Sequence, residues 1–165
     1  MTRLHARAVL DYPFSAPACD GSVVEVAPGI LWARMPMPMA LDHINVYLLR
    51  GDDGWTLIDT GLNTQAARDC WEHIAATHLQ GLPIARLVCT HMHYDHAGLA
   101  HWLCERFGIP LYMTHGEYFM MRTLAEPVPH PLPSAQEVFY ARSGMPPERT
   151  ERMWKAMRGD PFRPP

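Results

Sequence analysis

The sequence predicts an α/β fold in which a β-sheet is covered by helices. Three observations support this prediction: strand-like runs come first, a helical period follows, and strand and helix patterns then alternate up to about residue 113. Alternation of this kind places helices on the faces of a sheet. Hydrophobic residues make up 48% of the 165 residues and charged residues 19%, which is typical of a globular domain with a buried core. We therefore expect a single domain over residues 1–165.

The first part of the chain predicts two strand pairs. Runs of β-favouring residues stand on either side of two Gly-containing turns, which is the pattern of a β-hairpin. The four runs are residues 23–26 and 30–33 around Pro28-Gly29, and residues 45–49 and 55–58 around residues 52–54. Asp59-Thr60-Gly61 follows at the point where the last of these strands ends.

The middle of the chain predicts two strand–helix units. Asn63 is expected to cap a helix that runs to about residue 79 with apolar residues at helical spacing. Residues 86–89 form a short buried strand, and a second helix is expected over residues 95–107. Residues 109–113 then form a further strand, with its proline near the strand start.

Beyond residue 113 the pattern changes to helices separated by a proline-rich segment. Thr114 with Glu117, and Ser134 with Glu137, have the spacing of a capping box, in which each end of the motif bonds to the backbone of the other. A third helix is expected over residues 147–158, and the residues after it resemble a linker.

Composition argues against several function classes. The net charge of -3 gives no basic excess, so nucleic acid is not expected as a partner. No apolar run approaches the length of a membrane span, and the basic N-terminus is not followed by the apolar stretch of a signal peptide. The four cysteines contain no C-x-x-C pair, which favours reduced thiols in a cytoplasmic protein.

A cluster of metal-ligand residue types lies between the strand at 86–89 and the following helix. His91, His93, Asp95 and His96 place three imidazoles and one carboxylate within six residues. Residues two apart on an extended chain point the same way, so His91 and His93 can face one ion. Where the chain turns into the helix, Asp95 and His96 point elsewhere and can face a second ion nearby. Imidazole and carboxylate suit zinc, and also iron or manganese. The alternative is a polar segment in which Asp95 only caps a helix, but a cap does not need three histidines.

The motif Thr90-His91-x-His93-x-Asp95-His96-x-Gly98, an HxHxDH pattern, resembles the signature of the metallo-β-lactamase superfamily, which includes glyoxalase II-type thioesterases. The upstream Leu57-Ile58-Asp59-Thr60-Gly61 resembles the first motif of that family. The resemblance extends from about residue 22 to residue 118. It implies the N-terminal half of a four-layer αβ/βα sandwich, followed by a helical, Pro-rich extension and linker over residues 119–165.

The resemblance also implies roles for individual residues. His91 and His93 would ligate a first metal ion, and Asp95 and His96 a second, with zinc as the expected metal. Asp59 would orient the ligands from outside the coordination sphere. A metal-bound hydroxide would cleave an ester, thioester, phosphoester or lactam in a small-molecule substrate, and Asp95 would also act catalytically by handling the proton.

The sequence departs from the family pattern after His96. The family takes a third histidine for the first metal, and usually a bridging Asp and a final His, from the second half of its fold. His115 stands where the family often has a non-ligating histidine, and His130 lies in a proline-rich loop, so neither is expected to be a ligand. We therefore expect a homo-oligomer or a missing C-terminal half. The alternative is a non-catalytic fragment or module with an incomplete metal site.

The sequence also allows other interpretations. His-x-His alone also opens amidohydrolase barrels, but those need about 250 residues and would leave Asp59, Asp95 and His96 unexplained. Residues 118–121 can form an apolar substrate wall. The sheet can be covered by the late helices of the chain itself. The remaining histidines are expected at the surface or the edge of the core: His5, His43, His73, His78 and His101.

Overall fold

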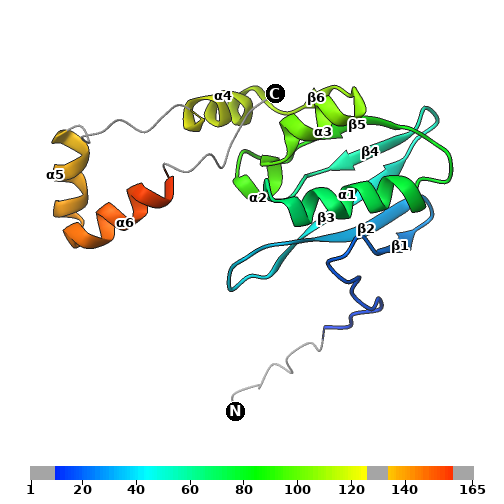
Figure 1. The fold of residues 1–165 in the computed structure, drawn as a ribbon, viewed down its shortest axis with the longest axis horizontal. Coiled ribbons are helices and arrows are strands. Elements are labelled where there is room, and N and C mark those ends of the chain that lie inside the picture. The colour runs from blue at the N-terminus through cyan, green and yellow to red at the C-terminus, as the bar shows by residue number, and fades with distance from the viewer. Residues whose placement is uncertain (1–9, 126–133, 158–165) are drawn as a thin grey trace, which may run out of the picture.

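A six-stranded sheet forms the centre of the protein, and helices lie on one of its faces (Figure 1). The structure is a computed structural model and describes residues 10–125 and 134–157. The strands follow one another across the sheet in chain order, and they are β1 (Val23–Ala27), β2 (Ile30–Pro36), β3 (His43–Arg50), β4 (Trp55–Ile58), β5 (Ile84–Val88) and β6 (Leu111–Tyr112). Strands β1 to β4 pair antiparallel, whereas β4, β5 and β6 pair parallel. The two hairpins and the later strands predicted from the sequence are therefore confirmed.

Helices connect the parallel strands and continue after them. They are α1 (Gln65–Thr77), α2 (Tyr94–Ala97), α3 (Ala100–Phe107), α4 (His115–Leu124), α5 (Ser134–Arg142) and α6 (Pro147–Met157). The predicted cap of α1 was wrong by one residue. Thr64 is the cap, because its hydroxyl accepts the Ala67 N–H at 3.2 Å, whereas the Asn63 side chain accepts from Arg68 instead. None of the described helices has the length and apolar character needed to cross a membrane.

The single helix expected over residues 95–107 is divided into α2 and α3. In a continuous helix the Leu99 N–H would bond to the Asp95 carbonyl. Here the Asp95 carbonyl accepts the Gly61 N–H at 2.9 Å, and the Leu99 N–H donates to the Thr60 hydroxyl at 3.1 Å. Two bonds to the loop after β4 replace one helical bond, so the break follows from tertiary contacts. The helix nevertheless ends at Gly108, in the left-handed conformation that glycine favours.

The hydrophobic core lies between the sheet and helices α1 and α3. Alternate residues of the strands point toward these helices and are fully or almost fully buried, among them Val46, Leu48, Leu57 and Leu87. Trp71 and Ile74 of α1 and Leu103 of α3 are equally buried on the opposite side of this layer. At about 25 cal/mol per Å² of apolar surface, each large side chain contributes roughly 1.5–3 kcal/mol to this packing.

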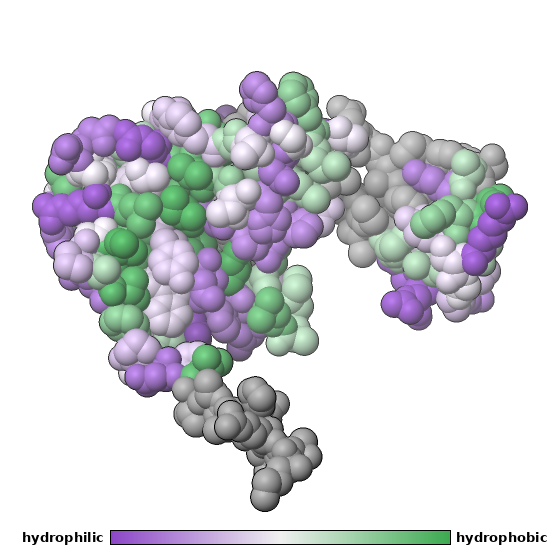
Figure 2. Space-filling model, turned by 180° about the vertical axis from the view of Figure 1, so that it is seen from behind, coloured by the Kyte–Doolittle hydropathy of each residue, from purple (hydrophilic) through white to green (hydrophobic). Residues whose placement is uncertain are grey.

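The other face of the sheet is not covered by α1 or α3. One row of mostly apolar side chains crosses all six strands in register: Val24, Trp32, Tyr47, Ile58, Val88 and Tyr112. We call this row the open-face row. Tyr47 is 37% exposed and Tyr112 is 53% exposed. Figure 2 shows the molecule from behind, where apolar and polar residues mix on the surface. Val46, Leu48 and Leu57 belong to the opposite face, which the helices already bury.

The late helices do not cover the open-face row within the described residues. Met121 of α4 is fully buried, but it packs into the core on the helical side. In α5, Val138 is 49% exposed and Phe139 is 63% exposed. Figure 1 shows α5 and α6 standing apart from the sheet. In the described part of the chain, the late helices therefore do not cover the sheet, although this was one of the alternatives expected from the sequence.

Candidate metal centre

The predicted site residues meet at the carboxyl ends of the parallel strands. Asp59 directly follows β4, and residues 89–93, which we call the metal loop, directly follow β5. Thr114 caps the helix that follows β6. In open α/β sheets, ligands bind in this position beyond the carboxyl ends of the strands. The topology therefore gathers the two sequence motifs, which are about 30 residues apart, into one place.

Asp59 is the most densely bonded side chain of the site. It is 5% exposed, and it adopts a positive φ of 64° that non-glycine residues rarely take. Its Oδ1 accepts the Thr90 N–H at 2.7 Å, and its Oδ2 accepts the Thr90 hydroxyl at 2.8 Å. Oδ2 also lies 2.8 Å from Nδ1 of His96. A buried carboxylate needs such partners, and sparsely populated backbone conformations occur mostly at functional sites.

These contacts set which ring nitrogen of two histidines is left for a metal. Because Asp59 is an acceptor, Nδ1 of His96 donates to it, and Nε2 then carries the lone pair. The Thr90 hydroxyl donates to Asp59 and lies 3.0 Å from Nδ1 of His91, so it accepts from that nitrogen. In both rings Nε2 is the nitrogen available to an ion.

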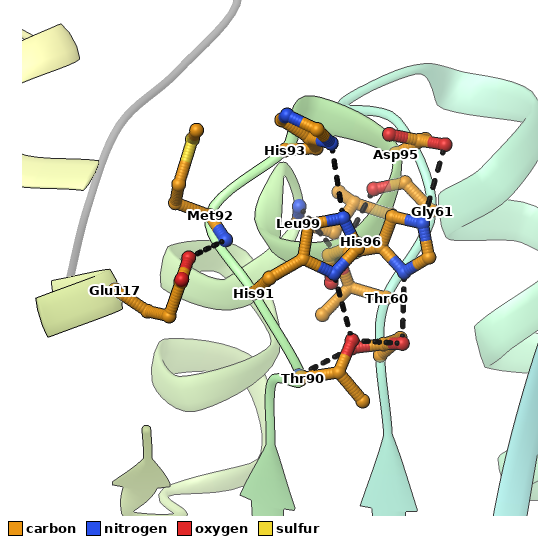
Figure 3. Close-up of polar contacts among 11 residues, drawn as sticks. Thr60, Gly61, Thr90, His91, Met92, His93, Asp95, His96, Leu99 and Glu117 are labelled. Carbon is orange, nitrogen blue, oxygen red and sulfur yellow. Dashed lines mark hydrogen bonds and ion pairs between the residues drawn. The ribbon is translucent and has the colours of Figure 1, made fainter. Parts of the chain in front are cut away.

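The four candidate ligands form two converging pairs (Figure 3). Nε2 of His91 lies 3.0 Å from Nδ1 of His93, and Nε2 of His96 lies 3.4 Å from Oδ2 of Asp95. Two nitrogens bound to one tetrahedral zinc at about 2.0–2.1 Å would stand roughly 3.3 Å apart, so both separations fit pairs that share an ion. The rings of His91 and His96 are 4.0 Å apart at their centroids, which brings the pairs together. Among the described residues, no three His, Cys, Asp or Glu side chains are arranged so that they could hold one metal ion together.

The motif glycines let the two loops approach closely. Gly61 has φ of 92°, and a Cβ there would stand 2.9 Å from Cβ of Met35. A Cβ on Gly98 would collide with the carbonyl oxygen of Tyr94 and stand 3.1 Å from the carbonyl oxygen of Gly61. Thr60, between Asp59 and Gly61, is fully buried and donates to the His96 carbonyl at 3.0 Å. These contacts fix the distance between α2 and the loop after β4.

The other described histidines have partners away from the cluster. His43 pairs with Asp42, His101 with Glu105, and His73 with His78 through their rings, while the ring of His115 packs edge-on against Phe119. None of them is placed with the metal loop. His5 and His130 lie outside the described residues. The third histidine that the resemblance implies is thus not found among residues 10–125 and 134–157.

Three polar residues make contacts at the site that were not predicted from the sequence. Thr60 and Thr90 belong to the two motifs, but only their tertiary bonds reveal what they hold. Glu117 was predicted to bond back to the Thr114 amide in a capping box. Instead, its Oε2 accepts the Met92 N–H of the metal loop at 2.9 Å (Figure 3). The sequence signal that could have indicated this contact is a carboxylate at the start of the helix that follows the third parallel strand.

The cysteines do not contribute to the cluster. All four are free thiols, and burial is the main cause that raises the pKa of each of them. For Cys70 the pKa is raised to about 11. Cys89 is the first residue of the metal loop, but its side chain is buried in the core, and this burial strongly raises the pKa of its thiol. Thiols of this kind are protonated at neutral pH and do not act as thiolate ligands.

Comparison with known proteins identifies the family. The model of the metallo-beta-lactamase superfamily matches residues 39–156. A protein described as "Probable metallo-hydrolase YqjP" from Bacillus subtilis (strain 168) is 45% identical over 71 residues, which is 42% of this chain and 22% of that protein.

Two solved structures are similar in both sequence and fold. A beta-lactamase domain protein from Burkholderia ambifaria has 48% identity and a TM-score of 0.67, with 70% of this chain and 39% of that chain covered. A metallo-beta-lactamase family protein from Thermus thermophilus has 30% identity and a TM-score of 0.63, with 86% of this chain and 46% of that chain covered. This chain therefore spans less than half the length of these relatives. The family match covers both motifs and most of the sheet and helices described above, and the chain belongs to the metallo-beta-lactamase superfamily.

Proposed function

We propose that this chain provides part of the metal centre of a hydrolase that cleaves small-molecule substrates. The observation that carries the proposal is the pairing of ligand atoms. Two nitrogens converge at 3.0 Å in one pair, and a nitrogen and an oxygen converge at 3.4 Å in the other. Both pairs lie partly exposed at the carboxyl ends of β4 and β5, where a substrate can reach them.

Each pair of ligands would hold one ion. His91 and His93 would bind the first, Asp95 and His96 the second, and zinc suits these nitrogen and oxygen donors, with iron or manganese as alternatives. A bound divalent metal would supply Lewis-acid activation of water and of the scissile carbonyl or phosphoryl group. Asp59 would not bind the metal, because both of its oxygens are engaged by Thr90 and His96.

Asp95 is the residue of the cluster best suited to move a proton. Its side chain is 29% exposed, and its Oδ2 faces Nε2 of His96 across 3.4 Å. A carboxylate that is in contact with the site and also open to solvent can take a proton at the reacting group and release it to water. The Asp95 backbone is fixed by the Gly61 N–H, so the side chain projects from a held position.

The metal ligands alone do not choose among a small ester, a thioester, a phosphoester and a β-lactam. All of these substrates present a polarised carbonyl or phosphoryl group, which the ligand set can serve equally. No described side chain singles out a lactam ring, and a fold shared with β-lactamases does not select the substrate. Phe119 and Met120 of α4 are 64% and 50% exposed and offer apolar surface for a substrate, whereas Met121 of the expected wall is buried in the core.

We further propose that a second polypeptide surface packs on the open-face row and completes the site. Trp32, Tyr47 and Tyr112 leave an apolar row partly exposed, and contiguous apolar surface of this kind marks an interaction site. The described residues supply only two nitrogen ligands to the first ion. A second copy of this chain, or a C-terminal half of the fold, would meet both needs.

The test is hydrolysis of a substrate panel with and without a chelator. Thioester, phosphoester, lactone and β-lactam substrates should be compared, with the His91→Ala/His93→Ala double variant as the inactive reference. The His73→Ala/His78→Ala double variant is the matched control, since it removes two neighbouring histidines outside the site. We expect turnover that is lost on metal removal and in the first double variant only. Turnover that survives complete metal removal would refute the proposal.

A further inference from the structure

We infer that Glu117 is a positioning residue for the metal loop, whose carboxylate fixes the Met92 amide and thereby the directions of His91 and His93. Glu117 lies in the first turn of α4, 25 residues along the chain from the amide that it binds. Its Oε2 accepts the Met92 N–H at 2.9 Å, as Figure 3 shows. The inference rests on the proposed function, because it assigns a role at the same site.

The simpler role for Glu117, a helix cap, does not explain where its carboxylate points. In a capping box the Glu side chain bonds to the backbone N–H of the cap residue. Only half of that motif is present: the Thr114 hydroxyl accepts the Glu117 N–H at 3.4 Å, and the carboxylate turns away to the metal loop. The Glu117 side chain therefore connects α4 to the metal loop and does not cap its own helix.

Two carboxylates accept hydrogen bonds from the metal loop, one on each side of His91. Asp59, from the end of β4, accepts the Thr90 N–H at 2.7 Å, and Glu117 accepts the Met92 N–H at 2.9 Å. Hydrogen bonds to a charged acceptor are each worth about 1.5–3 kcal/mol, more than a neutral bond. Fixing the amides that precede and follow His91 restricts its backbone, and Met92 is also the link between the two histidines.

Helix α4 is a firm support for this contact. Met121, one turn beyond Glu117, is fully buried in the core, and Thr114 caps the helix start. The Glu117 side chain is half-buried, so solvent screens its bond to Met92 less than it would at a fully exposed position. Ligands held by packed elements keep their geometry better than ligands on free loops.

Two conservative variants separate the hydrogen bond from the charge. Glu117→Gln keeps the length and an acceptor oxygen but removes the charge. Glu117→Asp keeps the charge and the favourable interaction with the helix start but is one methylene too short to reach Met92. Glu137→Asp is the matched control, because Glu137 is the acidic residue in the first turn of α5 and is exposed. The measurements are the zinc Kd by chelator competition, amide hydrogen exchange at Met92 without metal, and the thermal unfolding midpoint.

The inference predicts a split between the variants. Glu117→Asp should weaken zinc binding about tenfold and lose protection of the Met92 amide, as expected when a residue that orients ligands is removed. Glu117→Gln keeps a weaker, neutral bond to Met92 and should be affected less than Glu117→Asp, and Glu137→Asp should retain both properties. If Glu117→Asp binds zinc like the wild type, or if Glu117→Gln is as impaired as Glu117→Asp, the positioning role is wrong.

Failure of the inference and failure of the proposed function can be told apart. If the wild-type chain binds no zinc, the proposed metal centre fails. The exchange of the Met92 amide in the metal-free protein then still decides whether Glu117 holds the loop, since that measurement needs no ion.

Discussion

Replacing Asp59 by Asn tests whether this carboxylate sets the chemistry of the site or merely the shape of a turn. The substitution keeps the size of the side chain but turns one acceptor oxygen into an NH₂ donor. The Asp59 carboxylate accepts hydrogen bonds from three donors: the Thr90 N–H, the Thr90 hydroxyl and Nδ1 of His96. The new NH₂ must therefore face a donor, whichever way the amide is turned.

The consequence for His96 is a change of tautomer. If the Asn NH₂ faces His96, then Nδ1 must become the acceptor and the proton moves to Nε2. A protonated Nε2 cannot bind a metal, so the second pair with Asp95 is lost. If the NH₂ faces Thr90 instead, the Thr90 N–H loses its charged acceptor and the metal loop is released on that side.

The expected magnitudes follow from these losses. One charge-assisted bond lost in a buried position lowers the free energy of unfolding by about 2 kcal/mol. For a chain of this size that shift lowers the unfolding midpoint by about 4–8 °C and leaves the domain folded. Loss of an outer-shell partner weakens metal binding by about 10- to 100-fold, or roughly 1.4–2.8 kcal/mol.

The assay is a zinc Kd by chelator competition, measured beside thermal unfolding and the ¹⁵N chemical shifts of His96, which report the tautomer. Asp53→Asn is the control, because the exposed Asp53 carboxylate pairs only at the surface with Arg86, and such pairs contribute about 0–1 kcal/mol. A lower unfolding midpoint for Asp59→Asn with an unchanged zinc Kd would refute the reasoning. In that case Asp59 would serve only to stabilise the turn after β4.

Three other predictions follow from the described contacts. Gly98→Ala should lower the free energy of unfolding by about 1–3 kcal/mol by overpacking, measured by denaturant titration; a neutral effect would contradict the close approach of α2 and the loop after β4. The pKa of Cys70 is raised to about 11 by burial, so its alkylation, followed by peptide mass spectrometry, should still be rising at pH 10, and a plateau above pH 9 would contradict this. If the open-face row binds a second copy, light scattering should show an assembly larger than the monomer for the wild type and a monomer for Tyr47→Lys; a wild-type chain that stays monomeric at all concentrations would exclude the second copy.

The strands could be predicted from the sequence because their signals are local, and the cluster of His91, His93, Asp95 and His96 stands out for the same reason. Turn residues mark the ends of the strands, and three histidines with one aspartate in six residues have no common structural explanation. Which face of the sheet is covered was harder to predict. In β4 both Leu57 and Ile58 are apolar, and in β5 both Leu87 and Val88 are, so alternation alone does not say which side faces the helices.

The errors concern contacts between residues far apart in the chain. The helix break at Gly98 depends on bonds from Thr60 and Gly61, some 37 residues earlier, and no local propensity records them. The capping box at Thr114 correctly predicted the start of the helix, but the Glu117 carboxylate accepts the Met92 N–H of the metal loop and not the Thr114 N–H. A propensity predicts that a bond will be made but not which distant donor will make it.

The ligand geometry follows from how the backbone donors of the metal loop are satisfied. The Cys89 N–H still pairs with the Tyr112 carbonyl of β6, but beyond Cys89 the loop leaves the sheet and its amides need acceptors from elsewhere. The neighbouring strands β4 and β6 each deliver a carboxylate to it, from Asp59 directly and from Glu117 through α4. Asp59 also holds Nδ1 of His96, so one side chain fixes both a loop backbone and a ligand tautomer. The directions of the histidines are therefore set by two acidic residues that would touch no metal, and those residues are the sensitive positions at which to test the site.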